Sequence, residues 1–284
     1  MKTGVLYVVS TPIGNMEDVT FRAVDVLRKV DLIACEDTRN SRILLSRWEI
    51  STKLMSLHRF SESRKSQVIL HRLAAGENIA IISDAGTPAI SDPGSRLVRA
   101  ALEAGVIVTP VPGPSSITAA LSVSGMDCSS FVYLGFAPRT DRQRREFFEK
   151  VAHEPRTSLF FETAKRIQAT LGIANEVLGS RKLVLTRELT KLHEEIIAGT
   201  AERILSLFQP RTSVKGEIVV VVEGGAGSGP ELDICEAVRN LIEEGLSGKR
   251  LADEAHRRFG VKKSEAYEVF LRIKDEKADS EQEF

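Results

Sequence analysis

Four short segments of the sequence carry residue types that can bind or react with a charged small molecule. As a set they are rich in Gly, Pro, hydroxyl and carboxylate residues, and they are residues 11–15 (TPIGN), 36–39 (EDTR), 83–88 (SDAGTP) and 112–116 (PGPSS). In the richest of them, Gly86 lets the backbone approach a ligand closely and Pro88 fixes the turn that follows. Asp84 offers a carboxylate to an ammonium group or a ribose hydroxyl. Taken alone, each segment also fits an ordinary turn or helix cap.

The segments that precede these loops have the pattern of buried strands. Short apolar, β-branched runs occur at residues 5–9, 32–35, 78–82 and 106–111. Helix patterns follow, beginning near Asp18 and at residues 62–75 and 95–104, the last two ending at a glycine. Repeated strand–loop–helix units predict a parallel sheet covered by helices. Because ligands of such sheets bind beyond the carboxyl ends of the strands, we expect the four loops to share one rim.

The second half of the chain predicts a different sheet. Strand patterns occur at residues 131–136, 158–161, 182–186, 194–197 and 217–223, with helices at 141–152, 164–178 and 200–208. Several connections are short, which indicates a mixed sheet. A junction near residues 119–126 and a glycine-rich linker at 224–230 then divide the chain into domains at 1–120, 121–225 and 230–275. The last domain contains three short helices, at 231–245, 249–258 and 263–274, and the polar residues after them are expected to be disordered.

Composition excludes several classes of protein. The 284-residue chain has 42% hydrophobic and 27% charged residues and a net charge of zero, which is typical of a globular protein without overall attraction to nucleic acid. Its three cysteines have neither disulfide nor metal-site spacing, so we expect a cytoplasmic protein with no required metal. The sequence shows neither a secretory signal nor a membrane-spanning apolar run, which predicts no membrane partner. No GxxxxGK[ST] motif is present, which disfavours a nucleoside triphosphatase.

Further motifs follow the four loops in an order typical of one enzyme family. They are Asp92-Pro93-Gly94, Gly135-Phe136 with Pro138, Phe160-Phe161-Glu162, residues 187–191 (RELTK), Glu194, Lys215-Gly216-Glu217 and Gly260-Val261-Lys262-Lys263. With the loops, they make the chain resemble the tetrapyrrole-methylase superfamily, and within it the branch that methylates small-subunit ribosomal RNA. Sister branches that act on corrin precursors typically have a GxGPG-type loop after the first strand. This chain has TPIGN there, which favours the RNA branch.

The resemblance implies a fold, a cofactor and a reaction. The fold is a two-domain α/β tetrapyrrole-methylase-like fold, with a parallel-sheet N-terminal domain, a mixed-sheet second domain and a small helical C-terminal module. S-adenosylmethionine would bind in the cleft between the two α/β domains of a homodimer. The reaction would be methyl transfer to the ribose 2′-hydroxyl of a cytidine in 16S rRNA, at the position usually numbered 1402, in the decoding region of the small ribosomal subunit.

The residues expected to bind the cofactor come from three of the four loops. They are Pro12, Gly14, Ser83, Asp84, Ala85, Gly86, Thr87, Pro112, Gly113 and Ser115. A ribose hydroxyl is a weak nucleophile, so a base or a nearby positive charge should assist its attack. The candidates for this catalytic role are Glu36, Asp37, Glu188, Lys191 and Lys215. Each could instead form a surface ion pair, and the sequence does not choose between them.

Two groups of basic residues are candidates for RNA binding, because phosphate contacts would supply salt-dependent affinity. They are Arg139, Arg142, Arg144 and Arg145, and, in the helix-turn-helix-like C-terminal module, Arg250, Lys262 and Lys263. Acidic residues are interleaved in both groups, so solvated helix faces remain the alternative. Two other functions also remain open. One is methylation of a tetrapyrrole precursor, and the other is a non-catalytic RNA-binding protein with the same fold.

Overall fold

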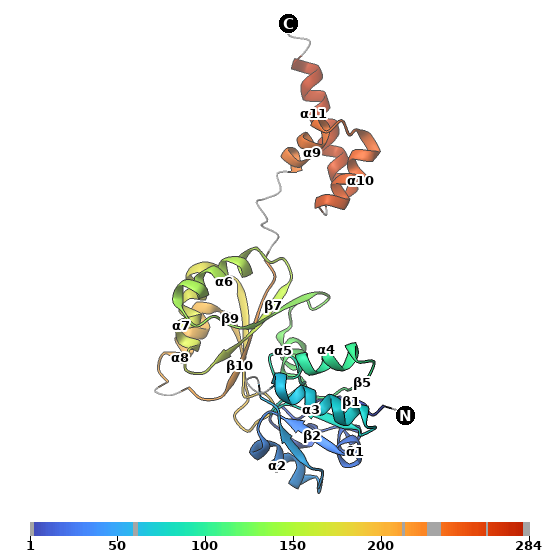
Figure 1. Cartoon of the computed structure of the whole chain (residues 1–284). Helices are drawn as coiled ribbons and strands as arrows, with labels where there is room; N and C mark the ends of the chain where they lie inside the picture. Colours follow the sequence, from blue (N-terminus) through green and yellow to red (C-terminus); the bar gives the residue numbers. More distant parts are fainter. Residues whose placement is uncertain (1–2, 59–61, 212–213, 226–233, 260, 281–284) are drawn as a thin grey trace. The chain divides into compact units, whose positions relative to one another are not determined.

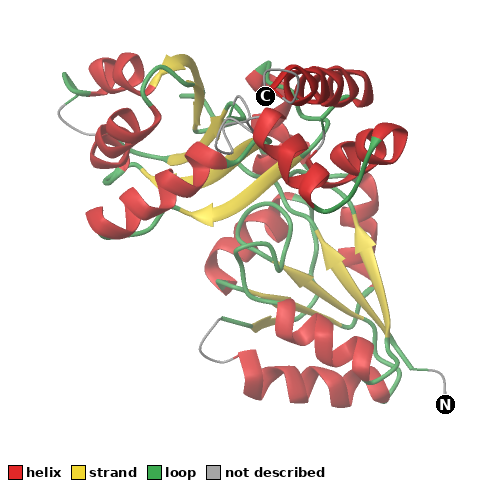
Figure 2. Cartoon of the chain, turned by 90° about the horizontal axis from the view of Figure 1, so that it is seen from above, coloured by secondary structure: helices red, strands yellow, loops and turns green. Residues whose placement is uncertain are grey.

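The computed structural model describes residues 3–58, 62–211, 214–225, 234–259 and 261–280 (Figure 1). The chain forms two compact units. The first comprises Met1–Ala152 and Arg156–Gly224, and the second comprises His153–Pro155 and Gly225–Phe284. The first unit contains two five-stranded sheets, and helices flank the strands of both (Figure 2).

The first sheet is parallel throughout, with the strand order β3-β2-β4-β1-β5. Its strands are β1 (Val5–Val9), β2 (Leu32–Cys35), β3 (Leu54–Ser56), β4 (Ile79–Ile82) and β5 (Ile107–Val111). Its helices are the 3₁₀ turn η1 (Met16–Asp18), α1 (Phe21–Lys29), α2 (Thr38–Arg47), α3 (Glu62–Ala74) and α4 (Ser95–Glu103). Apolar residues of α1 and α2 pack on one face, and those of α3 and α4 pack on the other. The predicted parallel sheet covered by helices is confirmed.

Two local predictions in this half need correction. The first helix begins at Phe21 and not near Asp18, because the Thr20 hydroxyl accepts a hydrogen bond from the Ala23 N–H and caps the helix there. Helix α2 and strand β3 are absent from the predicted elements. The sequence pattern of residues 36–39 indicates a polar strand end, whereas Asp37 caps α2 by accepting from the Arg39 N–H at 2.8 Å.

The second sheet is mixed, as predicted, with the order β6-β7-β10-β8-β9. Only the β6–β7 pair is parallel. The strands are β6 (Phe131–Phe136), β7 (Thr157–Thr163), β8 (Lys182–Arg187), β9 (Glu195–Thr200) and β10 (Glu217–Val222). Helices α6 (Asp141–His153), α7 (Ile167–Leu178) and α8 (Ala201–Phe208) pack on one face of this sheet.

The opposite face of the second sheet is covered by α5 (Ser116–Ser124), the helix that follows the last strand of the first sheet. Ala120 and Leu121 of α5 are buried against Leu159, Val184 and other side chains of the second sheet. The predicted junction at residues 119–126 lies in this helix and the turn after it. Because α5 starts at the edge of one sheet and packs on the other, it fixes how the two sheets meet.

The second unit is built from α9 (Ile234–Glu243), α10 (Gly248–Phe259) and α11 (Lys263–Ser280). Its core includes Val238, Leu241, Leu251, Ala255 and Ala266, so the amphipathic patterns correctly predicted three packed helices. Helix α11 extends to Ser280, beyond the predicted end at residue 274. Most of the predicted linker lies outside the described residues. In the ranges described, no helix is both long and apolar enough to cross a membrane.

Candidate functional site

Two loops at the carboxyl edge of the first sheet are joined by a short backbone bridge. Thr11, after β1, and Gly86, after β4, exchange backbone hydrogen bonds of 2.9 and 3.0 Å. The Thr11 hydroxyl donates to the Ser83 carbonyl at 3.1 Å, and the Ser10 and Thr87 hydroxyls lie 2.9 Å apart. These bonds hold Gly86 at a φ of 75°, a conformation that glycine adopts without strain.

The N-terminus of α5 forms the next part of the same edge. Ser115 is the N-cap residue, yet its side chain makes no capping hydrogen bond with the helix. The first N–H groups of α5 therefore keep their partial positive charge for another anionic partner. Gly113 lies tightly against the neighbouring loop, since a Cβ atom at this position would be 3.0 Å from the Cβ of Ser10.

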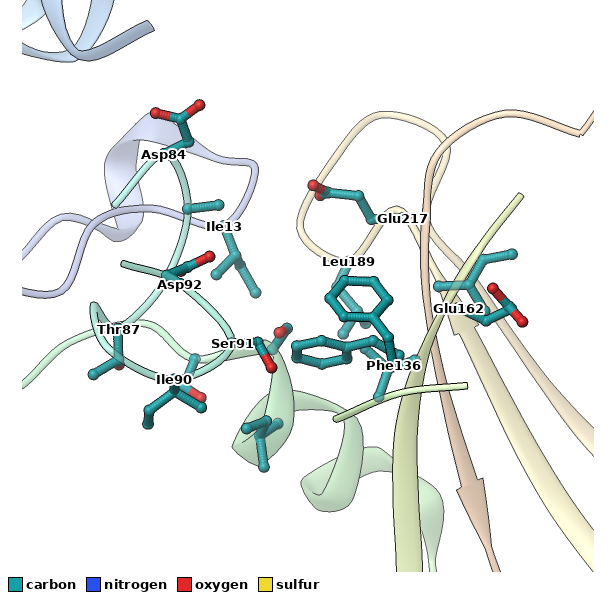
Figure 3. A pocket seen from close by; sticks show the side chains of 18 of the residues that line it. Ile13, Asp84, Thr87, Ile90, Ser91, Asp92, Phe136, Glu162, Leu189 and Glu217 are labelled. Carbon is teal, nitrogen blue, oxygen red and sulfur yellow. The ribbon is translucent and has the colours of Figure 1, made fainter. Parts of the chain in front are cut away.

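A cavity of about 410 Å³ lies between the two sheets of the first unit, a volume in the range of small-molecule sites (Figure 3). One wall comes from the loops of the first sheet and α5. It consists of Ile13, Glu36, Asp84, Ala85, Gly86, Thr87, Ile90, Ser91, Asp92, Ser115, Ser116 and Ile117. The other wall comes from the second sheet. It consists of Phe136, Phe161, Glu162, Thr163, Thr186, Leu189, Gly216, Glu217, Ile218 and Val219. All four predicted loops supply lining residues, so the predicted common rim is confirmed.

The Asp84 carboxylate is engaged by the protein itself. It accepts hydrogen bonds from the Asp37 N–H at 3.1 Å and from the Asn40 amide at 2.8 Å, which ties the β4 loop to the start of α2. Asp37 in turn pairs with Arg39, whose Nη2 lies 2.7 Å from Oδ2. Hydrogen bonds from the Arg39 side chain and backbone lower the pKa of Asp37 to about 2. Asp37 is thus a weak base that caps a helix, and it does not line the cavity.

A second charged cluster lies where the β8–β9 connection meets β10. Lys191 Nζ donates to Glu188 Oε1 and Glu217 Oε2, both at 2.9 Å, and the Glu217 N–H donates to Glu188 Oε1 at 3.0 Å. Burial lowers the pKa of Lys191, but the hydrogen bonds to Glu217 and Glu188 outweigh it and leave that pKa above its ordinary value. Burial raises the pKa of Glu188, and Lys191 and the Glu217 N–H reverse this to a net lowering. Both groups are therefore charged at neutral pH.

Gly14 brings this cluster against the first loop. A Cβ atom at Gly14 would lie 2.5 Å from Lys191 Cγ and 2.8 Å from the Leu189 carbonyl oxygen. Next to it, the Asn15 N–H donates to the Thr190 hydroxyl at 3.0 Å. The turn at residues 188–191 therefore packs directly on the first loop, with no space for a side chain between them.

Most of the non-glycine residues with a strained, positive φ lie around the cavity. In the described residues, positive φ occurs at five non-glycine positions, and four of them flank the cavity. They are Ala89 (69°), Ser91 (63°), Glu188 (52°) and Thr190 (66°). Such conformations cost on the order of 1 kcal/mol or more each and cluster at functional sites in proteins. Their placement on both walls makes this cavity the candidate functional site.

Aromatic rings line the wall formed by the second sheet. The Phe161 ring contacts Tyr133 and Phe136 edge to face, with centroid distances of 5.1 and 5.3 Å. The Tyr133 hydroxyl lies 2.5 Å from the Ser91 hydroxyl, which joins the two walls. Phe136 is 54% exposed. Phe136 and Phe161 belong to motifs of the sequence but have no role among the predicted site residues, so this wall of the site was missed.

Glu162 also belongs to that wall, but its carboxylate is bound within the protein. It lies 2.6 Å from Arg166 Nη2 and accepts 2.6 Å hydrogen bonds from the Thr163 N–H and the Thr170 hydroxyl. Its side chain has no exposed surface. Glu162 therefore stabilises the start of α7 and is not available to a ligand.

The structure divides the predicted cofactor residues into two sets. Those that line the cavity are Asp84, Ala85, Gly86, Thr87 and Ser115. Those that lie behind it or beside it and shape the loops are Pro12, Gly14, Ser83, Pro112 and Gly113. Of the five predicted catalytic residues, Glu36 alone lines the cavity. Lys215 is exposed and does not line the cavity, and its carbonyl accepts a hydrogen bond from Arg187.

The prediction of RNA binding is wrong for one residue, Arg144. Arg144 is only 5% exposed, and it donates to the Arg139 carbonyl at 3.1 Å and pairs with Asp141 at 2.8 Å, so it cannot reach an RNA phosphate. The other residues of both groups are exposed: Arg139, Arg142, Arg145, Arg250, Lys262 and Lys263. Three of these are paired, Arg142 with Glu146, Arg145 with Glu176 and Lys263 with Asp253. Across the described residues, no group of three His, Cys, Asp or Glu side chains could hold a metal ion.

The fold and the cavity together define an α/β protein with a cavity of small-molecule size between a parallel and a mixed sheet. A family model described as tetrapyrrole (corrin/porphyrin) methylases matches residues 5–205. The chain belongs to this family and is a methyltransferase, as the motifs predicted.

Similar proteins share nearly the whole chain. The ribosomal RNA small subunit methyltransferase I of Haemophilus influenzae is 42% identical over 95% of this chain and 97% of its own length. The protein of the same name from Escherichia coli O157:H7 is 42% identical over 94% of this chain and 95% of its own length. Among solved structures, the methyltransferase CobJ has a TM-score of 0.60 at 17% identity, covering 79% of this chain and 95% of that one. The uroporphyrin-III-C-methyltransferase of Thermus thermophilus has a TM-score of 0.52 at 20% identity, covering 86% of this chain and 100% of that one. These structures support the fold.

Proposed function

We propose that this protein transfers a methyl group from S-adenosylmethionine to the ribose 2′-hydroxyl of a cytidine in 16S rRNA, at the position usually numbered 1402. The observation that carries the proposal is the cavity between the two sheets, lined by all four loops of the motif set. Relatives about 40% identical over nearly the whole chain bear the name of ribosomal RNA small subunit methyltransferases, which supports an RNA acceptor over a tetrapyrrole.

The residues of the first wall fit S-adenosylmethionine, which supplies a methyl group on a positively charged sulfonium. Gly86 lines the cavity where a Cβ atom would enter the space between Ile13, at 3.5 Å, and the Pro114 carbonyl, at 3.9 Å. The N–H groups at the start of α5, beside Ser115 and Ser116, suit a carboxylate. Ile13 and Ile117 add apolar surface to the same wall. The wall therefore offers groups for an amino-acid carboxylate and for an uncharged ring system.

Acidic side chains give this site its electrostatic character. Glu36, Asp84 and Asp92 all line the first wall, and carboxylates favour both an ammonium group and a sulfonium. The Asp84 carboxylate already holds Asp37 and Asn40 in place, so we assign it to positioning the β4 loop. Glu36 is our candidate for the proton acceptor, because it is the predicted catalytic residue that lines the cavity. Its carboxylate would take the proton that the 2′-hydroxyl loses on attack.

The exposed basic residues are proposed to bind the phosphates of the RNA. Arg139 and Arg142 lie in the first unit, on the loop after β6 and on α6. Arg250 and Lys262 lie in the second unit, on α10 and just before α11. We propose that the three predicted domains divide the work into cofactor binding, acceptor binding and RNA recruitment, and that the protein acts as a cytoplasmic homodimer. Light scattering of the purified protein measures the dimer directly.

Mapping of ribose methylation tests the proposed reaction. 16S rRNA from cells that lack this protein should lose 2′-O-methylation at one cytidine. The purified protein with S-adenosylmethionine should restore it on small ribosomal subunits from those cells. An unchanged methylation pattern would refute the RNA assignment, and failure to bind S-adenosylmethionine in calorimetry would indicate a non-catalytic protein.

The role of Glu36 is tested separately. Glu36→Gln keeps the size and one acceptor oxygen of the side chain but removes its charge and its basicity. Loss of a general base costs about 10²- to 10⁴-fold in rate, so kcat should fall by that factor. The rate is measured at saturating S-adenosylmethionine, because the variant also removes one of the three carboxylates that favour a cation. The matched control is Glu17→Gln, at an exposed residue of η1 that does not line the cavity. If Glu36→Gln retains the rate of this control, Glu36 is not the base.

A further inference from the structure

Phe136 lies with its ring in the cavity although the alternation of its strand predicts the opposite direction. Residues two apart in a strand point to the same face, so Phe136 should follow Leu134 into the core packed by α6, α7 and α8. Leu134 does pack against that core. Phe136 instead contacts Phe161, which packs on the other face, and it is 54% exposed.

A β-bulge produces this change of direction. The pairing of β6 with β7 shifts in register between Tyr133 and Phe136. Within the shift lies Gly135, at a φ of 69°, a conformation that side chains rarely adopt. The extra residue turns the end of β6, so that Tyr133 and Phe136 both contact the ring of Phe161. Bulges of this kind often re-aim a side chain next to an active site.

The exposed ring of Phe136 packs against an aromatic neighbour. Phe161 supports it edge to face, and Phe161 is itself packed beside Tyr133. The Tyr133 hydroxyl bonds to Ser91 on the opposite wall, at 2.5 Å. Figure 3 shows Phe136 across the cavity from Asp84 and Thr87. The aromatic ring therefore lies across the cavity from the loops that we assign to the cofactor.

We infer that Phe136 is the stacking platform for the acceptor nucleobase, an inference that rests on the proposed function. A 2′-hydroxyl can enter a cavity between two sheets only when its nucleotide is splayed out of the surrounding RNA structure, and proteins hold such unstacked bases against aromatic side chains. An exposed aromatic face is the chemistry that such a base requires. The cofactor loops form the wall opposite, so a base stacked on Phe136 places its ribose between the two walls.

The test compares variants of Phe136 in methyl transfer to small ribosomal subunits that lack the modification. Loss of one base–aromatic stack corresponds to roughly 5- to 150-fold, so kcat/KM should fall by this factor in Phe136→Ala. Phe136→Leu, which keeps the apolar contact with Phe161 but has no ring, should lose most of the same factor. Phe136→Tyr should remain close to the wild type. The Kd for S-adenosylmethionine should be unchanged in all three. Phe131→Ala is the matched control, since Phe131 is 42% exposed on the same strand and does not line the cavity.

The outcomes separate the two proposals. An active wild type with an equally active Phe136→Ala variant overturns the platform and leaves the proposed function intact. An equal loss of S-adenosylmethionine affinity in Phe136→Ala also overturns it, because the ring would then support the cofactor. A wild type that binds S-adenosylmethionine but does not methylate these subunits overturns the proposed function, and the platform with it.

Discussion

Replacing Gly14 by alanine tests how the turn at residues 188–191 is held against the first loop. The added methyl group would lie 2.5 Å from Lys191 Cγ, 2.7 Å from the Thr190 hydroxyl and 2.8 Å from the Leu189 carbonyl. All three distances are shorter than any normal contact, so the turn must move away. That movement would stretch the 3.0 Å hydrogen bond from the Asn15 N–H to Thr190.

The expected cost follows from these contacts. Overpacking a tight contact costs about 1–3 kcal/mol, and a lost hydrogen bond costs about 0.5–1.5 kcal/mol. The reduced freedom of the unfolded chain returns about 0.4–1 kcal/mol, since Gly14 does not have a positive φ. The net loss is roughly 0.5–4 kcal/mol, which lowers the Tm of a unit of this size by about 1–16 °C. Because Leu189 lines the cavity, S-adenosylmethionine binding should weaken as well.

Thermal unfolding followed by circular dichroism measures the first effect, and titration calorimetry measures the second. The matched control is Gly172→Ala in the middle of α7, where a Cβ atom meets nothing within 4 Å. This control should raise the stability by up to about 1 kcal/mol, because alanine favours a helix over glycine. If Gly14→Ala also melts at or above the wild-type Tm, glycine is not required at this position for the close packing of the two loops.

Two further predictions concern charged hydrogen bonds. The pKa of Asp37 is lowered to about 2 by Arg39, so its contribution to stability is complete above the ordinary value of 3.8 and is lost as the pH falls through about 2. Arg39→Ala should raise that pKa toward the ordinary value in an NMR titration of the carboxyl carbon. Thr170→Val removes a 2.6 Å hydrogen bond to the buried Glu162 carboxylate, which should cost about 1.5–3 kcal/mol and lower the Tm by about 3–12 °C.

The serine variant of Thr170 is the control for the valine variant. Thr170→Ser keeps the hydroxyl donor but lacks the methyl group, and it should lose less stability than Thr170→Val. A valine variant that melts at the wild-type Tm while the serine variant is destabilised would show that the methyl group, and not the hydrogen bond, stabilises this position. For Asp37, an unchanged titration midpoint in Arg39→Ala would show that the backbone N–H groups of α2 alone hold the pKa low.

The common rim formed by the four loops could be predicted from the sequence, because loops that follow parallel strands lie at the same edge of the sheet. Once residues 5–9 and 79–82 are buried strands of one sheet, the loops after them must meet at one edge. The positions of individual side chains were less predictable. Ser83 and Asp84 both follow β4, yet Ser83 is 3% exposed and donates to the carbonyls of its own loop, whereas Asp84 lines the cavity.

The burial of Arg144 could have been predicted from the helical pattern of the sequence, but the prediction of RNA binding does not use that pattern. Within a helix, Arg144 shares a face with Phe148 and Val151, both of which are buried. The position of Arg144 on this apolar face of the helix therefore predicts a buried arginine. The prediction of RNA binding considered only that Arg144 belongs to a group of basic residues. Its neighbour Arg145 lies on another face and is exposed.

Phe136 could not be placed from the sequence. Its orientation depends on the register of β6 against β7, and that register is decided by pairing between segments about 25 residues apart. Gly135 is compatible with a bulge, but an isolated glycine in a strand occurs equally at a tight bend or where another backbone approaches closely. The wall formed by the second sheet was missed for this physical reason.

The place of β10 in the second sheet has a consequence for how the protein matures on the ribosome. β10 is the last strand of that sheet to be synthesised, yet it lies in the centre, between β7 and β8. Its valines are buried on both faces, and its first residues form part of the cavity wall. The nascent chain can complete the first sheet once residue 111 has emerged, but β7 and β8 have no common neighbour until Val222 follows. A stalled or truncated chain thus exposes two unpaired strand edges, and the ligand cavity is the final element of the first unit to be completed.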